Sequence, residues 1–414
     1  MVTYLIRRLL LAIPTFFGCT LVVFTIVQLA PGGPFEQQVR QLKMSGGERG
    51  GGGGIASSGE QTIPPRALEE LRRYYQYDKP IWERYLCWLG AWPREVDQYT
   101  IQLDTARLVG NGQRVIVRKT GGAYTVYHAD STGVVASGWS VASTVLSDGT
   151  TNTYVYRKEI SGILQGNFGK SKDYGEPVME LVKQRLPVSI QVGLSGFVIS
   201  YVVAFTLGVQ KALRHKSMFD VVSSFSVVAL NSLPGWALGA LLLMFFATQA
   251  YWPILPLGNI QSADYDMLQL GSKILDRAAH FILPTIAYSV AGIASLTMLM
   301  KNSLLENLGM DYVRTAFAKG IREQRVVWYH ALRNSIIPLA SRAGFIIAVF
   351  LGASYLIEYV FNIDGLGRLS YMSILSRDYT VVFAFTVINV ATLLIGNLLS
   401  DVILAMVDPR IRFR

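Results

Sequence analysis

The chain has 414 residues, of which 51% are hydrophobic and only 16% are charged, against the ~25% of charged residues in soluble domains, so a membrane protein is expected. Its net charge of +10 is scattered along the chain rather than gathered in stripes with aromatic residues, which argues against a nucleic-acid partner. The 2 cysteines and 4 histidines lack the spacing of a disulfide framework or a metal site, so neither is expected.

Apolar runs long enough for a membrane helix, which needs ~20 residues, follow one another along the chain. They cover residues 9–31, 186–210, 221–246, 278–300, 336–357 and 379–400. The first run exceeds the apolar core of a cleaved signal peptide, so we expect it to stay as a helix. The sequence therefore predicts an all-α polytopic membrane protein with six transmembrane helices.

The short loops predict how these helices face, because cytoplasmic loops carry an excess of lysine and arginine. Basic residues precede the first helix and follow the second, and residues 301–335 hold 6 basic and 3 acidic side chains. We therefore expect both termini and the 301–335 loop in the cytoplasm. The expected parts are an N-terminus with the first helix (1–30), an external region (31–185), five further helices (186–406) and a cytoplasmic tail (407–414).

The external region divides into three parts. Residues 46–54 are a Gly-rich linker, and residues 64–92 have apolar positions at helical spacing. From 96 to 160, the alternating segments RVIVRKT, AYTVYHA and NTYVYRKE are separated by glycine-containing turns. We expect a compact β-rich module there, with an array of marginal hairpins as the alternative. Its tyrosines are either exposed anchors for a partner or packed against the module itself: Tyr124, Tyr127, Tyr154 and Tyr156.

Polar and helix-breaking residues within the apolar runs are further candidates for function. Ser195 lies in GLSG, which resembles the Gly-x-Ser-Gly of intramembrane serine proteases, with His280 as the possible base. Their expected depths in the membrane differ, so close packing of small residues is the favoured interpretation. Pro234 would kink the third helix, which suits either a cavity wall or packing. Arg342 either extends to the membrane interface or lines a polar pathway.

A short basic helix is expected between the fourth and fifth membrane helices, in the sequence DYVRTAFAKG at residues 311–320. Asp311 can cap a helix of residues 312–319, and Gly320 can supply the left-handed residue that ends it. A second basic helix is expected at about 323–334. We expect the pair to stand just outside the bilayer on the cytoplasmic side.

The first of these short helices has two different faces. Val313 and Phe317 are four residues apart and can rest together on the membrane domain. The opposite face combines polar and small side chains: Tyr312, Thr315, Ala316 and Lys319. The small residues leave a narrow helix, which can enter a groove on a cytoplasmic partner.

Further segments share motifs with one family of membrane proteins. With DYVRTAFAKG and HALRNSIIPL, they are YLIRRLLLAIPTFFGCTLVVFTIVQLAPGGP, RLPVSIQVGL, EYVFNIDGLGRLSYMSILSRDYTVV and DPRIRFR. Together they resemble the permeases of ATP-binding cassette (ABC) importers, in the dipeptide and oligopeptide group. APGGP and LTMLMKNSLLE point to the Yej-type permeases of peptide and microcin C importers. The resemblance covers residues 1–92 and 161–414, whereas residues 93–160 have no recognised counterpart. A second departure is Phe317, which stands where the family usually has a basic or small residue.

The resemblance implies a type I ABC importer fold in the bacterial inner membrane. It implies pairing with a second, similar permease, with two ATPase subunits or one fused ATPase, and with a periplasmic substrate-binding protein. Peptides are the implied cargo, and the chain itself is a transport subunit, not an enzyme. It needs no cofactor, because ATP and Mg²⁺ bind to the partner ATPases. The alternatives are an intramembrane serine protease using Ser195 and, within the ABC class, a nickel-importer permease.

The resemblance also implies a role for the short helix at 311–320, which corresponds to the helix that couples these permeases to their ATPases. Closure of the ATPase pair would pull on this helix and open the cavity between the permeases outward. The implied contact residues are Asp311, Tyr312, Arg314, Thr315, Ala316, Ala318, Lys319 and Gly320.

Overall fold

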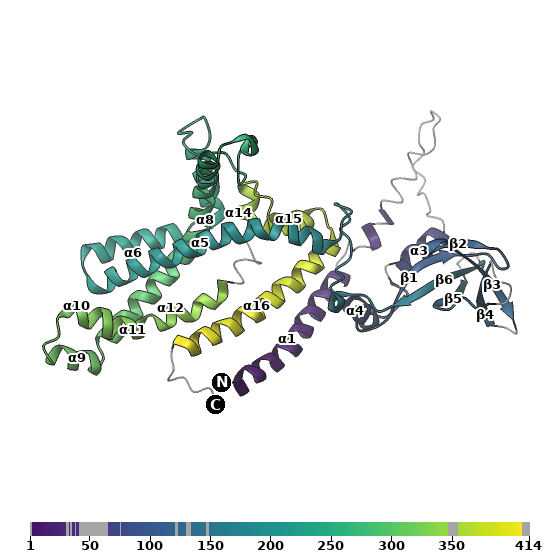
Figure 1. Ribbon diagram of the computed structural model, residues 1–414, viewed down its shortest axis with the longest axis horizontal. Coiled ribbons are helices and arrows are strands. Elements are labelled where there is room, and N and C mark those ends of the chain that lie inside the picture. Colours follow the sequence, from purple (N-terminus) through teal and green to yellow (C-terminus); the bar gives the residue numbers. More distant parts are fainter. Residues whose placement is uncertain are drawn as a thin grey trace. The chain divides into compact units, whose positions relative to one another are not determined.

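The computed structural model describes residues 2–29, 33, 35–37, 39–40, 65–74, 76–120, 123–129, 134–145, 149–346 and 355–407. The chain forms two compact units. The first contains residues 1–20 and 170–414, and the second contains residues 21–169. Helix α1 (Val2–Leu29) contributes to both units, which are described separately below (Figure 1).

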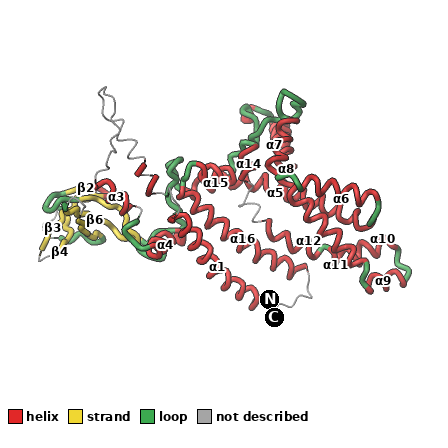
Figure 2. Tube along the Cα trace, turned by 180° about the vertical axis from the view of Figure 1, so that it is seen from behind, coloured by secondary structure: helices red, strands yellow, loops and turns green. Residues whose placement is uncertain are grey.

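The first unit is built from helices of very different lengths (Figures 1 and 2). Its long helices are α5 (Val178–Leu213), α8 (Leu270–Leu308) and α16 (Tyr379–Val407). The shorter ones are α6 (Met218–Asn231), α7 (Gly235–Phe246), α9 (Asp311–Ala318), α10 (Glu323–Arg325), α11 (Leu332–Ser335), α12 (Ile337–Arg342), α14 (Tyr355–Val360) and α15 (Leu366–Leu375). A π-helical segment, Val326–Ala331, joins α10 to α11.

Several of these helices are long and apolar enough to cross a membrane. Among the described residues there are 4, namely α1 from Ile6 onward, α5, α8 and α16, and the α6–α7 pair makes 5 if it counts as one span. The pair is bent by 94° at its break. Pro234 is the N-cap residue of α7, so the expected kink is a complete interruption of the helix. The predicted span at 336–357 lies partly on residues 347–354, which are outside the described ranges.

Small residues allow α5 and α8 to pack closely against each other. A Cβ atom added at Gly196 would lie 2.5 Å from Cβ of Tyr288, and one added at Gly208 would lie 2.6 Å from Cβ of Met300. The hydroxyl of Ser200 donates to the carbonyl of Gly196 at 2.7 Å and to that of Ser289, on α8, at 2.9 Å. These contacts support the packing role expected for the small residues of this helix.

In the described part of the second unit, helices α3 and α4 accompany two antiparallel three-stranded sheets, ordered β1–β6–β5 and β2–β3–β4. The helices are α3 (Pro65–Tyr74) and α4 (Ile81–Leu89). The strands are β1 (Arg94–Thr100), β2 (Arg107–Val109), β3 (Gln113–Thr120), β4 (Ala123–His128), β5 (Trp139–Val145) and β6 (Thr151–Glu159). Val115, Val117 and Val155 are fully buried between them. Within the described residues, this unit therefore has helices between residues 65 and 89 and strands between residues 94 and 159.

The tyrosines of β6 face inward rather than outward. Tyr154 is only 8% exposed, and Tyr156 is equally buried two residues later on the same face of the strand. The guanidinium of Arg73, on α3, lies 3.6 Å from the centre of the Tyr154 ring. Burial raises the pKa of the Tyr154 hydroxyl to about 12. The idea that these two tyrosines are exposed anchors is therefore wrong, because Tyr154 packs against Arg73 of α3 and Tyr156 packs beside Tyr154. Tyr124 and Tyr127 are half-buried.

Candidate functional site

Helix α9 follows α8 directly and is seated on the helices of the first unit. Val313 is fully buried and Ala316 is only 6% exposed. Both belong to an apolar cluster that also contains Met300 and Leu304 of α8 and, after α9, Val326. The buried side of α9 therefore fixes the helix to the end of α8, so that a force on α9 is passed to the long helix.

The ends of α9 differ slightly from the expected ones. Met310 is the N-cap residue, and Asp311 is the first helical residue rather than the cap. The carboxylate of Asp311 lies 3.6 Å from the guanidinium of Arg314, and both side chains are exposed. Gly320 has a φ of +76°, which confirms the predicted left-handed residue beyond the helix.

The two faces of α9 are also assigned differently by the structure. Val313 and Ala316, three residues apart, face the apolar cluster, whereas Phe317 is 43% exposed. The expected pairing of Val313 with Phe317 was wrong because spacings of three and four residues both bring side chains to one face. We call the exposed residues of this helix and the residue after it the outer face of α9: Asp311, Tyr312, Arg314, Thr315, Phe317, Ala318 and Lys319. The Tyr312 hydroxyl donates to Oδ1 of Asn307 at 2.7 Å, which ties this face to the end of α8.

The second basic helix adds aromatic residues that the sequence reasoning did not single out. Val326, Val327 and Ala331 are buried, so the helical run from α10 to α11 shares the apolar cluster with α9. Trp328 and Tyr329 are exposed. The signal in the sequence was the run WYH, which sets two adjacent large aromatic residues inside a basic helix, where both cannot face the same apolar cluster.

A buried ionic cluster joins three helices near α9. The Nζ atom of Lys301, on α8, lies 2.7 and 2.8 Å from the two carboxylate oxygens of Asp220, at the start of α6. Lys211, at the end of α5, is fully buried, and its Nζ atom lies 3.4 Å from Oδ1 of Asp220 and 2.6 Å from the hydroxyl of Ser224. Lys301 is about two turns before the end of α8. The cluster therefore attaches α5 and α6 to the helix that leads into α9.

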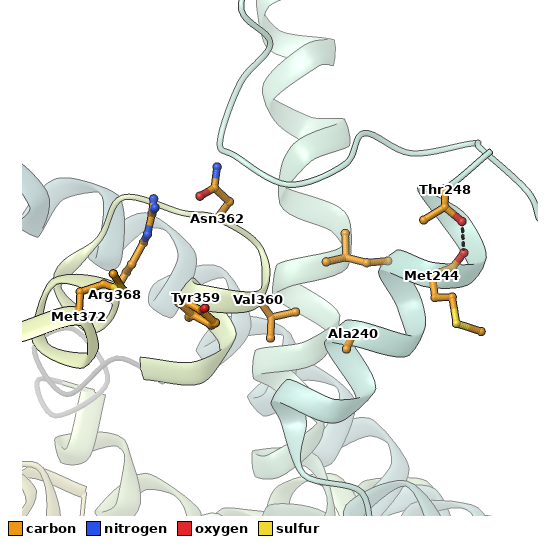
Figure 3. Close-up of a pocket in the computed structure, with 9 residues that line it drawn as sticks. Ala240, Met244, Thr248, Tyr359, Val360, Asn362, Arg368 and Met372 are labelled. Atoms are coloured by element: carbon orange, nitrogen blue, oxygen red, sulfur yellow. Dashed lines mark hydrogen bonds between the residues drawn. The ribbon is translucent and has the colours of Figure 1, made fainter. Parts of the chain in front are cut away.

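A cavity of about 720 Å³ lies between α7 and the α14–α15 segment (Figure 3). Figure 3 shows Ala240, Met244 and Thr248 on one side and Tyr359, Val360 and Arg368 on the other. The remaining lining residues are Leu243, Asn362 and Met372. None of these residues was predicted as a site, because they come from two segments more than a hundred positions apart.

The wall of this cavity is held in place by a buried carboxylate. Glu358 is fully buried and accepts hydrogen bonds from the backbone N–H of Arg368 at 2.9 Å and from the hydroxyl of Ser189 at 2.8 Å. The Ser189 hydroxyl in turn accepts one from the N–H of Leu366 at 2.7 Å. A Cβ atom added at Gly365 would clash with the Glu358 carboxylate, so glycine is needed for this approach. Glu358 thereby satisfies the free N–H groups at the start of α15.

The residues of the protease alternative are engaged elsewhere. The Ser195 hydroxyl lies 2.7 Å from that of Thr285 and donates to the carbonyl of Val192 at 2.8 Å. The Nδ1 atom of His280 lies 2.8 Å from the carbonyl oxygen of Asp276. A serine nucleophile needs a base within hydrogen-bonding reach, and here each residue has a different partner. Arg342 is exposed as the last residue of α12, which agrees with both of its expected roles.

Comparison with known proteins agrees with this architecture. Residues 200–413 match the family described as the inner membrane component of binding-protein-dependent transport systems. The chain is 32% identical, over 99% of its length and 98% of the relative's, to the inner membrane ABC transporter permease protein YejB of Escherichia coli O157:H7. The peptidoglycan transport system permease protein YejB of Agrobacterium fabrum is similar to the same extent, with 32% identity over 99% and 98% of the two chains.

A further relative belongs to the oligopeptide group. The oligopeptide transport system permease protein AppB of Bacillus subtilis is 34% identical over 62% of this chain and 80% of its own. The resemblance to Yej-type and oligopeptide permeases found in the sequence is therefore confirmed. Its expected extent is corrected, because the alignments with the two YejB proteins span 99% of the chain and so include residues 93–160, for which no counterpart was expected. These relatives are transport components rather than enzymes. The chain belongs to the family of inner membrane components of binding-protein-dependent transport systems.

Proposed function

We propose that this chain is a permease subunit of an ATP-driven importer whose cargo is peptides or peptide-containing compounds. The observation that carries the proposal is the similarity to YejB permeases over nearly the whole chain. One relative is named for oligopeptide transport and another for peptidoglycan transport. Short peptides are common to both, since peptidoglycan carries peptide stems, and microcin C falls in the same chemical class.

The proposed importer contains a second, similar permease, two ATPase subunits or one fused ATPase, and a periplasmic binding protein. The two permeases form the translocation pathway, and the ATPases bind ATP and Mg²⁺. The excess of basic residues in the short loops supports a cytoplasmic location for both termini and for α9, where an ATPase would reach the outer face of α9. Residues 31–185 then lie on the periplasmic side.

The coupling step rests on how α9 is attached. Val313 and Ala316 anchor α9 to α8, while Asp220 and Lys301 attach α6 to α8 near the same end. Closure of the ATPases would move α9 and, through these contacts, α8 and α6 together. ATP binding shifts the permease only if the ATPases bind the two conformations of this region unequally.

The proposal is tested by reconstituting the permease pair with its ATPases in proteoliposomes and measuring uptake of a radiolabelled tripeptide with purified binding protein. We expect uptake that requires ATP and this chain, and no ATP hydrolysis by the chain alone. A muropeptide and Ni²⁺, tested in parallel, identify the cargo class. Uptake of Ni²⁺ but of neither peptide, or ATP turnover by the isolated chain, would contradict the proposal.

We further expect the β-rich module to be removable without loss of the membrane complex. Arg94 and Glu159 are paired at the two ends of the module, on β1 and β6, so a short Gly/Ser joint can replace residues 96–158. Apolar side chains exposed on the module offer a docking surface for the binding protein: Leu108, Val134, Val135 and Val145. The deletion is expected to leave assembly intact but to weaken binding-protein docking at least tenfold by surface plasmon resonance. Unchanged affinity and uptake would show that the module serves another purpose.

A further inference from the structure

The cavity between α7 and the α14–α15 segment has the properties of a small-molecule site. Its volume of about 720 Å³ falls within the ~300–1,000 Å³ typical of such sites. The lining is mostly apolar, with Met244 and Met372 supplying flexible side chains that adapt to different contents. Tyr359, Asn362 and Arg368 add a small number of polar groups (Figure 3). Such a lining suits cargo of one chemical class with variable side chains.

Arg368 brings a positive charge to the cavity that the surrounding acids do not neutralise. The carboxylate of Glu358 already accepts hydrogen bonds from the backbone N–H of Arg368 and from the hydroxyl of Ser189. Asp364 is paired with Arg185, whose Nε atom lies 2.9 Å from Oδ1 of the aspartate. Within the described ranges, the guanidinium of Arg368 forms neither an ion pair nor a hydrogen bond. A guanidinium presents a planar fork of donors that matches a carboxylate in two parallel hydrogen bonds.

The cavity lies far from the coupling helix. Helix α7 packs on α8 at Ala287, because a Cβ atom at Gly235 would lie 2.8 Å from the Ala287 carbonyl oxygen. Helix α8 continues from there to Leu308, a rise of about 30 Å at 1.5 Å per residue. Figure 1 likewise shows α9 beyond one end of α8, well separated from α14. The predicted membrane span covers residues 278–300, so Ala287 lies about 20 Å from the end of the span that leads into α9, and the cavity lies in the outer half of the hydrocarbon layer.

We propose that this cavity is a binding site for peptide cargo and that Arg368 binds the C-terminal carboxylate of the peptide. The inference rests on the proposed function, since it names the part of the permease that first holds the cargo released by the binding protein. Neutral side chains of the peptide contact the two methionines and Tyr359. Peptides that lack a terminal carboxylate, such as C-terminal amides, are then poorer cargo at this step.

The first test measures initial uptake of a tripeptide by the complete reconstituted complex, at a fixed, saturating concentration of peptide-loaded binding protein. Arg368→Gln is expected to lower uptake at least tenfold, because the substitution removes a charge-assisted hydrogen bond to the peptide carboxylate. Arg368→Lys is expected to recover most of the rate. The matched control is Arg377→Gln, because Arg377 is exposed beyond the end of α15 and does not line the cavity. Uptake by Arg368→Gln within twofold of wild type would overturn the inference.

The second test asks whether peptide enters the cavity itself. In a Cys19→Ser background, Met372→Cys is expected to be labelled by a tripeptide that carries an N-terminal maleimide, and excess unlabelled tripeptide should protect it. Adding Arg368→Gln should lower the labelling rate at least tenfold. Ile374→Cys is the control, since Ile374 is exposed on the same helix but outside the cavity lining.

The outcomes separate this inference from the proposed function. If the wild-type complex imports peptide but the Met372→Cys and Ile374→Cys variants are labelled at equal rates, the cavity is not the cargo site although the importer is. If Arg368→Gln weakens docking of the binding protein and leaves labelling unchanged, Arg368 belongs to that interface and the inference is wrong. If the wild-type complex imports no peptide, the proposed function itself fails.

Discussion

Replacing Ala318 by tryptophan is expected to abolish ATP-driven uptake while leaving the folding of the chain unchanged. Ala318 is exposed on the outer face of α9, so an indole there can extend into solvent without entering the apolar cluster. An ATPase groove shaped for a narrow helix would be overpacked, at a cost of about 1–3 kcal/mol or more. Copurification of the ATPases and the ratio of peptide imported to ATP hydrolysed measure the effect. We expect either loss of the ATPases or hydrolysis without uptake.

The matched variant is Ala316→Trp, which separates docking from folding. Ala316 is buried against the apolar cluster that contains Met300 and Leu304, so an indole there overpacks the permease itself. Its midpoint of thermal unfolding should fall, whereas that of Ala318→Trp should match wild type. Ala318→Ser should import peptide normally. Normal uptake and ATPase binding by Ala318→Trp would show that the outer face of α9 is not the docking surface.

Features that depend on local sequence were predictable. The position and length of α9 followed from its composition and from Gly320, whose positive φ ends the helix. The strands with strong alternation, β3, β4 and β6, coincide with the segments read as strands. Polar and apolar residues alternate less clearly in β1 and β5, so these strands were not predicted. They form because both pair with β6.

Features that depend on contacts between distant segments were not predictable. Hydropathy predicted one membrane helix at 221–246 with a kink at Pro234, whereas the structure has two helices bent by 94° at this proline. Hydropathy measures how apolar a segment is and contains no information about the direction of its helix axis. The choice between Phe317 and Ala316 as the buried partner of Val313 is made by the cluster on α8. The cavity that contains Arg368 depends on the approach of α7 to α14, which no spacing within either segment encodes.

The ionic cluster around Asp220 is another contact of this kind, because Asp220 and Lys301 are 81 positions apart. In the sequence, Asp220 was only the first acid after a run of basic residues. The structure makes it the centre of a buried network that Lys301, Lys211 and the backbone N–H of Lys216 share. Removing one member of such a network leaves the opposite charges buried without compensation.

Asp220→Ala is therefore expected to lower the free energy of unfolding by about 3–5 kcal/mol. Both lysines lose their carboxylate, although Lys211 keeps its contacts with Ser223 and Ser224. Lys301→Leu should cost less, because Asp220 retains Lys211 at 3.4 Å. The midpoint of thermal unfolding of the purified permease pair, in one detergent, measures both variants.

The control is Asp266→Ala, since Asp266 is an exposed acid on the same unit and its removal should leave the unfolding midpoint unchanged. Where Lys301→Leu still folds, we expect its complex to hydrolyse ATP with less peptide imported per ATP. The reason is that α6 then loses its ion pair with the end of α8 that carries α9. An unfolding midpoint for Asp220→Ala equal to that of Asp266→Ala would mean that the cluster does not stabilise the fold. Wild-type import per ATP by Lys301→Leu would mean that it does not transmit the movement of α9.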